Sequence, residues 1–180
     1  MALLAEEIVE EWLNRQGFFT IRGIKLGVHE MDLLALRPSA NGVECRHLEA
    51  QASVRPISYL TRVPKAVQTA TGRAPGSSKT RVEEELRQGV NEWIAKKYDY
   101  PEKQRVRSRL AAGPWSRELV VHRVKFPEEL AMIEQSGITV HRLADIVADL
   151  QARQFLLAGA AGAHLVELIT LRAAEILAER

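Results

Sequence analysis

The stretch GVHEMDLLALRPSANGVECRHLEAQ (residues 27–51) decides the fold of this chain. It contains two apolar runs joined by the segment 38–42, Pro-Ser-Ala-Asn-Gly, whose residues are typical of a turn. The pattern predicts two strands joined by a turn-forming connector. The runs also carry Glu30, Asp32 and Glu49, although burying an unpaired carboxylate is costly. A purely structural hairpin has little use for these three acids.

Strand geometry explains where the acids point, because successive side chains of a strand face opposite sides of a sheet. One face carries the polar side chains, which are Glu30 and Asp32 in one run and His47, Glu49, Gln51 and Ser53 in the other. The opposite face carries Met31, Leu33 and Ala35, then Leu48, Ala50 and Ala52. If the strands are neighbours, Asp32 and Glu49 converge. Paired carboxylates need a proton or a cation between them, and oxygen ligands favour Mg²⁺ or Mn²⁺ over zinc.

Several of these side chains also have a purely structural explanation. Asp32 and Glu49 can each cap a turn or pair with an arginine. His47 can be a half-buried histidine held by hydrogen bonds rather than a ligand. Glu6 lies at the edge of the apolar stripe of the first helix and can reach inward, or it can serve as a first-turn charge that stabilises the helix dipole.

The elements around the hairpin follow from the same periodicities. We predict helices over 2–16, 80–98, 127–137 and 144–151 and from about 163 onward. We predict strands over 18–26, 29–37, 43–54, 117–126 and 138–143. Strands interleaved with helices indicate an α/β domain with a mixed sheet.

Composition excludes several classes of protein. The chain has 180 residues, of which 46% are hydrophobic and 27% charged, as in a folded globular domain. One cysteine, Cys45, permits no internal disulfide, so a reducing, cytoplasmic location is expected. The segment 1–13 lacks the basic start of a signal peptide, and no apolar run reaches membrane-spanning length. We therefore expect no membrane partner.

The segments AEEIVEEWLNRQGF, GVHEMDLLAL and ECRHLEAQ together resemble the core of the PD-(D/E)XK nuclease superfamily, over roughly residues 5–53. The matching residues are Glu6, Gly17-Phe18, Gly27, Glu30, Asp32 and Glu49. The resemblance implies a restriction-endonuclease-like, three-layer α/β core with a central mixed sheet flanked by helices. It also implies a metal-dependent DNA endonuclease or a repair or resolvase-type phosphodiesterase.

The same resemblance implies roles for individual residues. Asp32, Glu49 and the Ala50 carbonyl would hold one Mg²⁺ or Mn²⁺ ion, with Glu30 and Glu6 in support. Gln51 stands where the family has its catalytic lysine, and its amide can orient a water molecule but brings no positive charge. Lys65 is the nearest candidate for a lysine supplied from another element, and a plain surface lysine is the alternative.

Positive charge is concentrated in the middle of the chain. Residues 53–115 hold 13 Lys and Arg against 6 Asp and Glu, whereas the remainder holds 12 against 17. This balance suits a polyanionic partner such as DNA, although a solvated helical surface is the alternative. The expected phosphate-binding residues are Arg55, Arg62, Lys65, Lys79, Arg81, Lys103, Arg105 and Arg107. Tyr98, Tyr100 and Trp115 can stack on bases or pack in the core.

We expect residues 1–180 to form a single nuclease-like domain. Its parts are the motif-bearing core (5–53), a basic helical middle (54–115) and C-terminal strands and helices (116–180). The last helix, with Leu165, Ile169, Leu171 and Ile176, suits either a homodimer interface or the domain core. Two rival functions stay open. One is an impaired nuclease-like protein that binds nucleic acid or a protein without cutting, and the other is an unrelated α/β interaction protein with structural acids.

Overall fold

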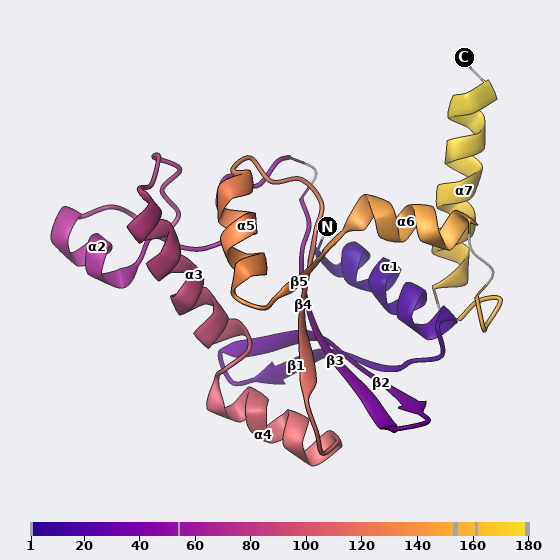
Figure 1. Ribbon diagram of the computed structural model, residues 1–180. Coiled ribbons are helices and arrows are strands. Elements are labelled where there is room, and N and C mark those ends of the chain that lie inside the picture. Colours follow the sequence, from indigo (N-terminus) through magenta and orange to yellow (C-terminus); the bar gives the residue numbers. More distant parts are fainter. Residues whose placement is uncertain (1, 54, 153–154, 161, 179–180) are drawn as a thin grey trace.

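The computed structural model describes residues 2–53, 55–152, 155–160 and 162–178, with side chains from residue 4 to residue 171 within those ranges. Its centre is a mixed sheet of five strands in the order β1-β2-β3-β4-β5 (Figure 1). The strands are β1 (Phe19–Leu26), β2 (His29–Ser39), β3 (Gly42–Gln51), β4 (Trp115–Val121) and β5 (Thr139–Arg142). The β1–β2 and β2–β3 pairs are antiparallel, and β4 and β5 run parallel to β3.

Helices cover both faces of this sheet (Figure 1). One face carries α1 (Ala2–Arg15), α6 (Leu143–Ala152) and α7 (Ala163–Ala178). The other carries α3 (Glu83–Lys97), α4 (Pro101–Leu110) and α5 (Pro127–Gln135), with the short α2 (Lys65–Thr71) beyond α3. The predicted α/β class with a helix-flanked mixed sheet is confirmed.

The face alternation predicted for the hairpin is also confirmed. Leu33, Ala35 and Leu48 are buried in one hydrophobic cluster with Val9 and Leu13 of α1. The stripe of α1 thus lies on the apolar face of β2 and β3, as its i, i+3, i+4 spacing requires. Asp32 and Glu49 are the sequence neighbours of Leu33 and Leu48, so their side chains point to the opposite face of the sheet. That face is covered by α3 and α4.

A second cluster fills the space between the sheet and that opposite layer. Leu119 and Val121 of β4 pack there with Val90 and Trp93 of α3 and Ile133 of α5. In β4, Val120 points into the first cluster instead, so this strand is buried on both faces. A continuous apolar run such as Leu119–Val120–Val121 is what a strand covered on both sides needs.

Some element boundaries differ from the predicted ones. The middle of the chain forms three helices, although only 80–98 was predicted with bounds. Strand β4 ends at Val121 rather than near 126, because the chain bends there and Val124 makes only an isolated bridge with Ile57. Strand β3 ends at Gln51, and Val54 of the predicted 43–54 strand lies outside the described residues.

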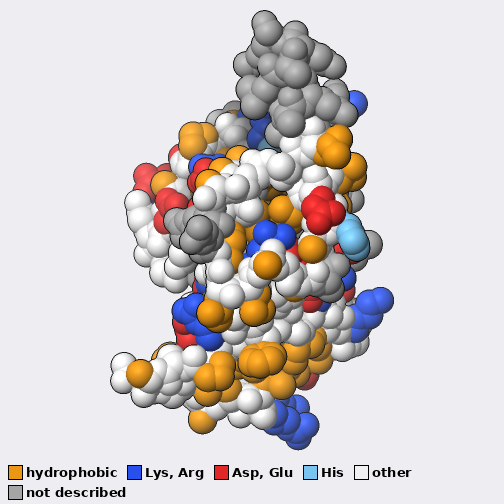
Figure 2. All heavy atoms as spheres, turned by 90° about the vertical axis from the view of Figure 1, so that its right-hand side faces the viewer, with side chains coloured by type: hydrophobic (Ala, Val, Ile, Leu, Met, Phe, Trp, Pro, Cys, Tyr) orange, Lys and Arg blue, Asp and Glu red, His pale blue; other side chains and the backbone are white. Residues whose placement is uncertain are grey.

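The last helix has both a packed and an open side. Val166 is buried, and Leu165 and Ile169 pack against the cluster under α1. Leu168 and Leu171 are exposed, and Figure 2 shows hydrophobic side chains at the surface on this side of the molecule. Core packing thus accounts for part of the stripe, while Ile176 lies outside the described side chains and a homodimer stays a prediction. Among the described residues, no helix has the length and hydropathy needed to cross a bilayer.

Candidate functional site

Asp32 lies where strands β2 and β3 separate. The last pair in register is Leu33 with Leu48, and beyond it Oδ2 of Asp32 accepts a hydrogen bond from the Ala50 N–H at 2.8 Å. The carboxylate therefore replaces the main-chain acceptor that a continuing strand would supply. Because the N–H and C=O of one strand residue point to the same neighbour, the Ala50 carbonyl lies on the Asp32 side as well.

Glu49 sits inside a cage of cationic and hydrogen-bonding groups. Its side chain is fully buried, with Lys97 Nζ 2.5 Å from Oε2 and Lys103 Nζ 2.9 Å from Oε1. His47 Nε2 lies 3.1 Å from Oε1. Burial alone would raise the pKa of Glu49, but the His47 hydrogen bond and the two lysines lower it to about 2. Glu49 is therefore ionised at neutral pH although it is buried.

A further row of side chains supports this cage from behind. Arg107 Nη1 lies 3.0 Å from Nδ1 of His47, and its Nη2 donates to the Tyr98 carbonyl at 2.7 Å. Since a guanidinium only donates, Nδ1 accepts and Nε2–H donates to Glu49, which assigns a neutral tautomer. Burial lowers the pKa of His47, in keeping with this assignment. His47 is thus the buried, hydrogen-bonded histidine of the structural alternative.

Asp32 has the opposite electrostatic character. Burial first, and then the charge of Glu49, raise the pKa of Asp32 to about 7, and a side-chain hydrogen bond with Glu49 acts in the same direction. The two carboxylates are therefore within hydrogen-bonding reach of each other, as the face alternation predicted. Lys97 and the Ala50 N–H act against the increase but do not cancel it. The charge of Asp32 lacks a full counterion.

The two remaining predicted acids border this pair. Glu6 of α1 is buried, and burial followed by the charge of Glu30 raises its pKa, with a smaller contribution from Glu49. Glu30 is exposed on β2. The structure therefore brings four carboxylates into one electrostatic neighbourhood, with Asp32 and Glu49 in direct reach of each other.

The residues fit a divalent cation under one condition. Two carboxylates in contact, one of them short of positive charge, are hard oxygen donors of the kind that Mg²⁺ and Mn²⁺ prefer. However, the Lys97 ammonium contacts Oε2 of Glu49, so it must move away before a cation can bind that oxygen. The Lys97 side chain is 23% exposed, so it has room to move. Among the described residues, no group of three or more His, Cys, Asp and Glu side chains is arranged to hold a metal ion.

A cleft of about 850 Å³ opens beside these acids. Gln51 lines it at the end of β3, and Lys97 lines it from the last turn of α3. Lys65, the candidate for a lysine supplied from another element, also lines the cleft. Among the described residues, no ion pair joins it to the acids. The lysine that reaches the acids is Lys97 instead.

The predicted phosphate-binding residues divide into two groups. Five are exposed, namely Arg55, Arg62, Lys65, Lys79 and Arg105, and of these Arg62 and Lys65 line the cleft. The other three, Arg81, Lys103 and Arg107, are at most 8% exposed and bind groups inside the protein. Contrary to the expectation, these three do not present their charge at the surface.

Arg81 and Glu129 instead fix one wall of the cleft. Glu129 of α5 accepts the N–H groups of Leu60 (2.6 Å) and Thr61 (3.0 Å). Arg81 donates to Oγ1 of Thr61 at 3.0 Å and to its carbonyl at 3.2 Å. The segment carrying Arg62 is thereby held by buried charged groups, which hold it more firmly than neutral contacts would.

Sequence reasoning missed Lys97 and placed Lys103 at the surface, although a signal for Lys97 was present. Leu86, Val90 and Trp93 form the buried stripe of α3, and Lys97 continues it at the next turn. A lysine on an apolar stripe needs a buried partner. Lys103 and Arg107 are four residues apart on α4, so they share one helical face, and both point into the protein.

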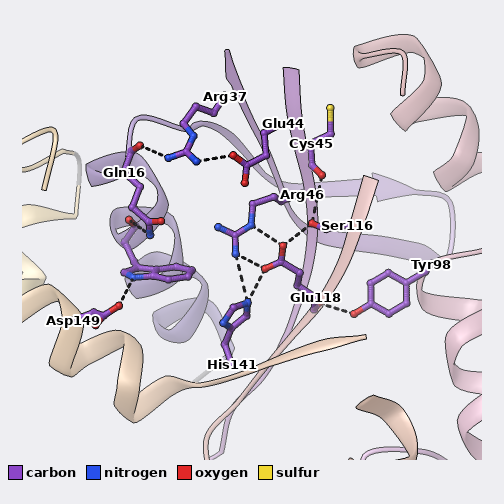
Figure 3. A network of polar contacts seen from close by, with 11 residues as sticks. Gln16, Arg37, Glu44, Cys45, Arg46, Tyr98, Ser116, Glu118, His141 and Asp149 are labelled. Atoms are coloured by element: carbon purple, nitrogen blue, oxygen red, sulfur yellow. Dashed lines mark hydrogen bonds and ion pairs between the residues drawn. The ribbon is translucent and has the colours of Figure 1, made fainter. Parts of the chain in front are cut away.

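The other face of β3 carries a separate polar network (Figure 3). Arg46 of β3 binds both carboxylate oxygens of Glu118 on β4, with Nε 2.6 Å from Oε1. Ser116 and His141 Nε2 contact the same carboxylate at 2.5 and 2.7 Å. Burial opposes ionisation, but the hydrogen bonds from His141 and Arg46 lower the pKa of Glu118 to about 2. This network links β3, β4 and β5.

Comparison of the chain with protein-family models, curated proteins and solved structures finds no match. The function is therefore inferred from the site itself.

Proposed function

We propose that this chain is a restriction-endonuclease-like, metal-dependent DNA phosphodiesterase, either an endonuclease or a repair or resolvase-type enzyme. One observation carries the proposal: Asp32 and Glu49 meet at the end of β3, and Lys97 joins them from α3. The resemblance calls for an acid pair with an adjacent lysine, but Gln51 stands at the position of that lysine. Lys97 supplies the missing positive charge from another element.

The chemistry follows from what each side chain can offer. A divalent ion, when bound, supplies the charge that activates water and offsets charge at the phosphate. Asp32 and Glu49 would hold it, with the Ala50 carbonyl and, from the exposed edge, Glu30 as further oxygen donors. Gln51 borders the cleft and orients a water molecule through its amide. Lys97 brings a positive charge to the phosphate from the cleft wall, and Glu6 adds negative charge that favours a cation.

Supercoiled plasmid and branched DNA incubated with Mg²⁺ or Mn²⁺ test this proposal. Cleavage should depend on the metal and disappear in the Asp32→Ala variant prepared in the same way. Cleavage that persists in Asp32→Ala would contradict the assignment. We further propose a cytoplasmic location, because the chain has a single cysteine and can form no internal disulfide.

A second candidate is a nucleic-acid-binding protein that does not cut. The observation that favours it is the saturation of Glu49, both of whose oxygens already contact an ammonium group. Salt-sensitive binding to DNA without metal-dependent cleavage would support this candidate over the first.

A further inference from the structure

The cleft beside Gln51 is strongly cationic. Arg62, Lys65, Lys96 and Lys97 line it, against one acid, Glu92. The carboxylate of Glu92 already accepts the Lys65 main-chain N–H, with oxygens 3.1 and 3.4 Å away. Within the described part of the chain, Arg62, Lys65 and Lys96 have no ion-pair partner. Their charge is available to an anionic ligand.

An aromatic pair stands in the same cleft. His29, at the start of β2, and Tyr100, just before α4, both line it, and their ring centroids are 3.8 Å apart. Each ring is half-buried, so part of its surface is accessible. Aromatic rings beside a row of cations are the combination that binds nucleic acid through stacked bases and phosphate contacts.

The size of the cleft limits what it can hold. Its volume of about 850 Å³ lies within the range of small-ligand sites, so it holds roughly one or two nucleotides. Bases of a duplex are stacked on each other, and a protein ring can stack on one only after that base is unpaired. A continuous duplex therefore does not satisfy this cleft.

We infer that the cleft binds an unpaired strand of DNA, with a base on the His29–Tyr100 pair and phosphates along Arg62, Lys65 and Lys96. The strand then runs toward Gln51 and Lys97, so the preferred substrates are single-stranded, frayed or branched ends. The direction toward the acids rests on the proposed function, whereas the binding itself does not. Rigid support of the Arg62 wall by Glu129 keeps the cleft formed before the strand arrives.

Fluorescence anisotropy in EDTA measures this binding without any cleavage. The probes are a labelled oligo(dT) and a blunt duplex of equal length. Oligo(dT) should bind more tightly, and Tyr100→Ala should weaken it by roughly 5- to 150-fold, while Tyr100→Phe retains binding. Arg62→Gln and Lys96→Gln should each make the slope of log K against log [salt] shallower by about 0.7.

Arg142→Gln is the matched control, because Arg142 is exposed on β5 and does not line the cleft. Equal or tighter binding of the duplex overturns the inference. So does a reduction in the salt dependence of oligo(dT) binding that is as large in Arg142→Gln as in Arg62→Gln. An oligo(U) probe that binds more tightly than oligo(dT) would keep the cleft but correct its ligand to RNA. Single-strand binding without metal-dependent cleavage would support the cleft and contradict only the nuclease proposal.

Discussion

The ammonium of Lys97 lies 2.5 Å from Oε2 of Glu49, which joins the last turn of α3 to the end of β3 across 48 positions of sequence. Lys103, one helix later, contacts the other oxygen of the same carboxylate and is 1% exposed. The two lysines thus hold one acid in different surroundings. Lys97 borders the cleft, whereas Lys103 is enclosed. Under the proposed function, this difference assigns Lys97 to the chemistry and Lys103 to the structure.

Replacing Lys97 with methionine should lower the cleavage rate at saturating DNA by about 10²- to 10³-fold, because the positive charge beside the scissile phosphate is lost. Lys125→Met removes an exposed lysine outside the cleft and should cleave at the wild-type rate. Rates are compared by single-turnover cleavage. Equal rates for the two variants would exclude a role for Lys97 in the chemistry.

Replacing Lys103 with methionine should destabilise the protein by about 3–5 kcal/mol, because one oxygen of the buried Glu49 loses its charged partner. Lys103 Nζ also donates to the Lys97 carbonyl at 2.9 Å, so the end of α3 loses a hydrogen bond. Urea unfolding measures the loss. The Lys97→Met variant should lose clearly less stability; similar losses would mean that the two lysines share one structural role.

A lysine at position 51 should compensate for the loss of Lys97, since Gln51 and Lys97 line the same cleft. We expect the double variant Lys97→Met/Gln51→Lys to cleave at least about tenfold faster than Lys97→Met alone. The Gln51→Lys change in the wild-type background should add little. A double variant as slow as Lys97→Met would show that the two positions are not equivalent.

Metal ions should stabilise the protein through Asp32. Anything that binds only the folded state raises the melting temperature, so Mn²⁺ should increase Tm of the wild type but not of Asp32→Asn. Without metal, Asp32→Asn should melt above the wild type at pH 8, because its amide removes a charge whose burial, together with repulsion from Glu49, raises the pKa of Asp32 to about 7. Asp145→Asn, at an exposed carboxylate of α6, should keep the metal effect.

The Arg46–Glu118 pair should make stability depend on acid pH. The pKa of Glu118 is about 2 in the folded protein against 4.5 ordinarily, so its contribution is complete above about pH 4.5 and is lost as the pH falls toward 2. Glu118→Gln should lower the free energy of unfolding by about 3–5 kcal/mol near neutral pH. It should also remove the dependence of this free energy on pH between about 4.5 and 2. Glu44→Gln, which breaks a half-exposed pair with Arg37, should cost about 1 kcal/mol or less. Equal costs would contradict the assignment.

Local periodicity was enough to predict the strands of the hairpin and the side of the sheet on which Asp32 and Glu49 lie. Period-two alternation is a property of the backbone, and it holds wherever the strand is formed. The stripe of α1 and the apolar run of β4 are local patterns of the same kind. These elements could be located without knowing their neighbours.

The partners of Glu49 could not be located in this way. Lys97 and Lys103 reach it from helices whose placement depends on how α3 and α4 turn at Tyr98–Tyr100 and pack on the sheet. Charge counts along the chain treated Arg81, Lys103 and Arg107 as surface cations, because burial of a charge is decided by distant partners such as Glu129 and His47. The sequence alone does not reveal those pairings.

The enclosed contact between Lys103 and Glu49 affects how substitutions in descendants of this sequence should be judged. If the chain has the proposed nuclease function, a lineage that loses catalysis would still need an acid at position 49 to neutralise Lys103, so selection for folding alone would preserve it. Folding does not require a lysine at position 97 in the same way, because the Lys97 side chain borders solvent. Loss of the lysine at 97 would therefore mark the loss of activity earlier, and more reliably, than any change at Glu49.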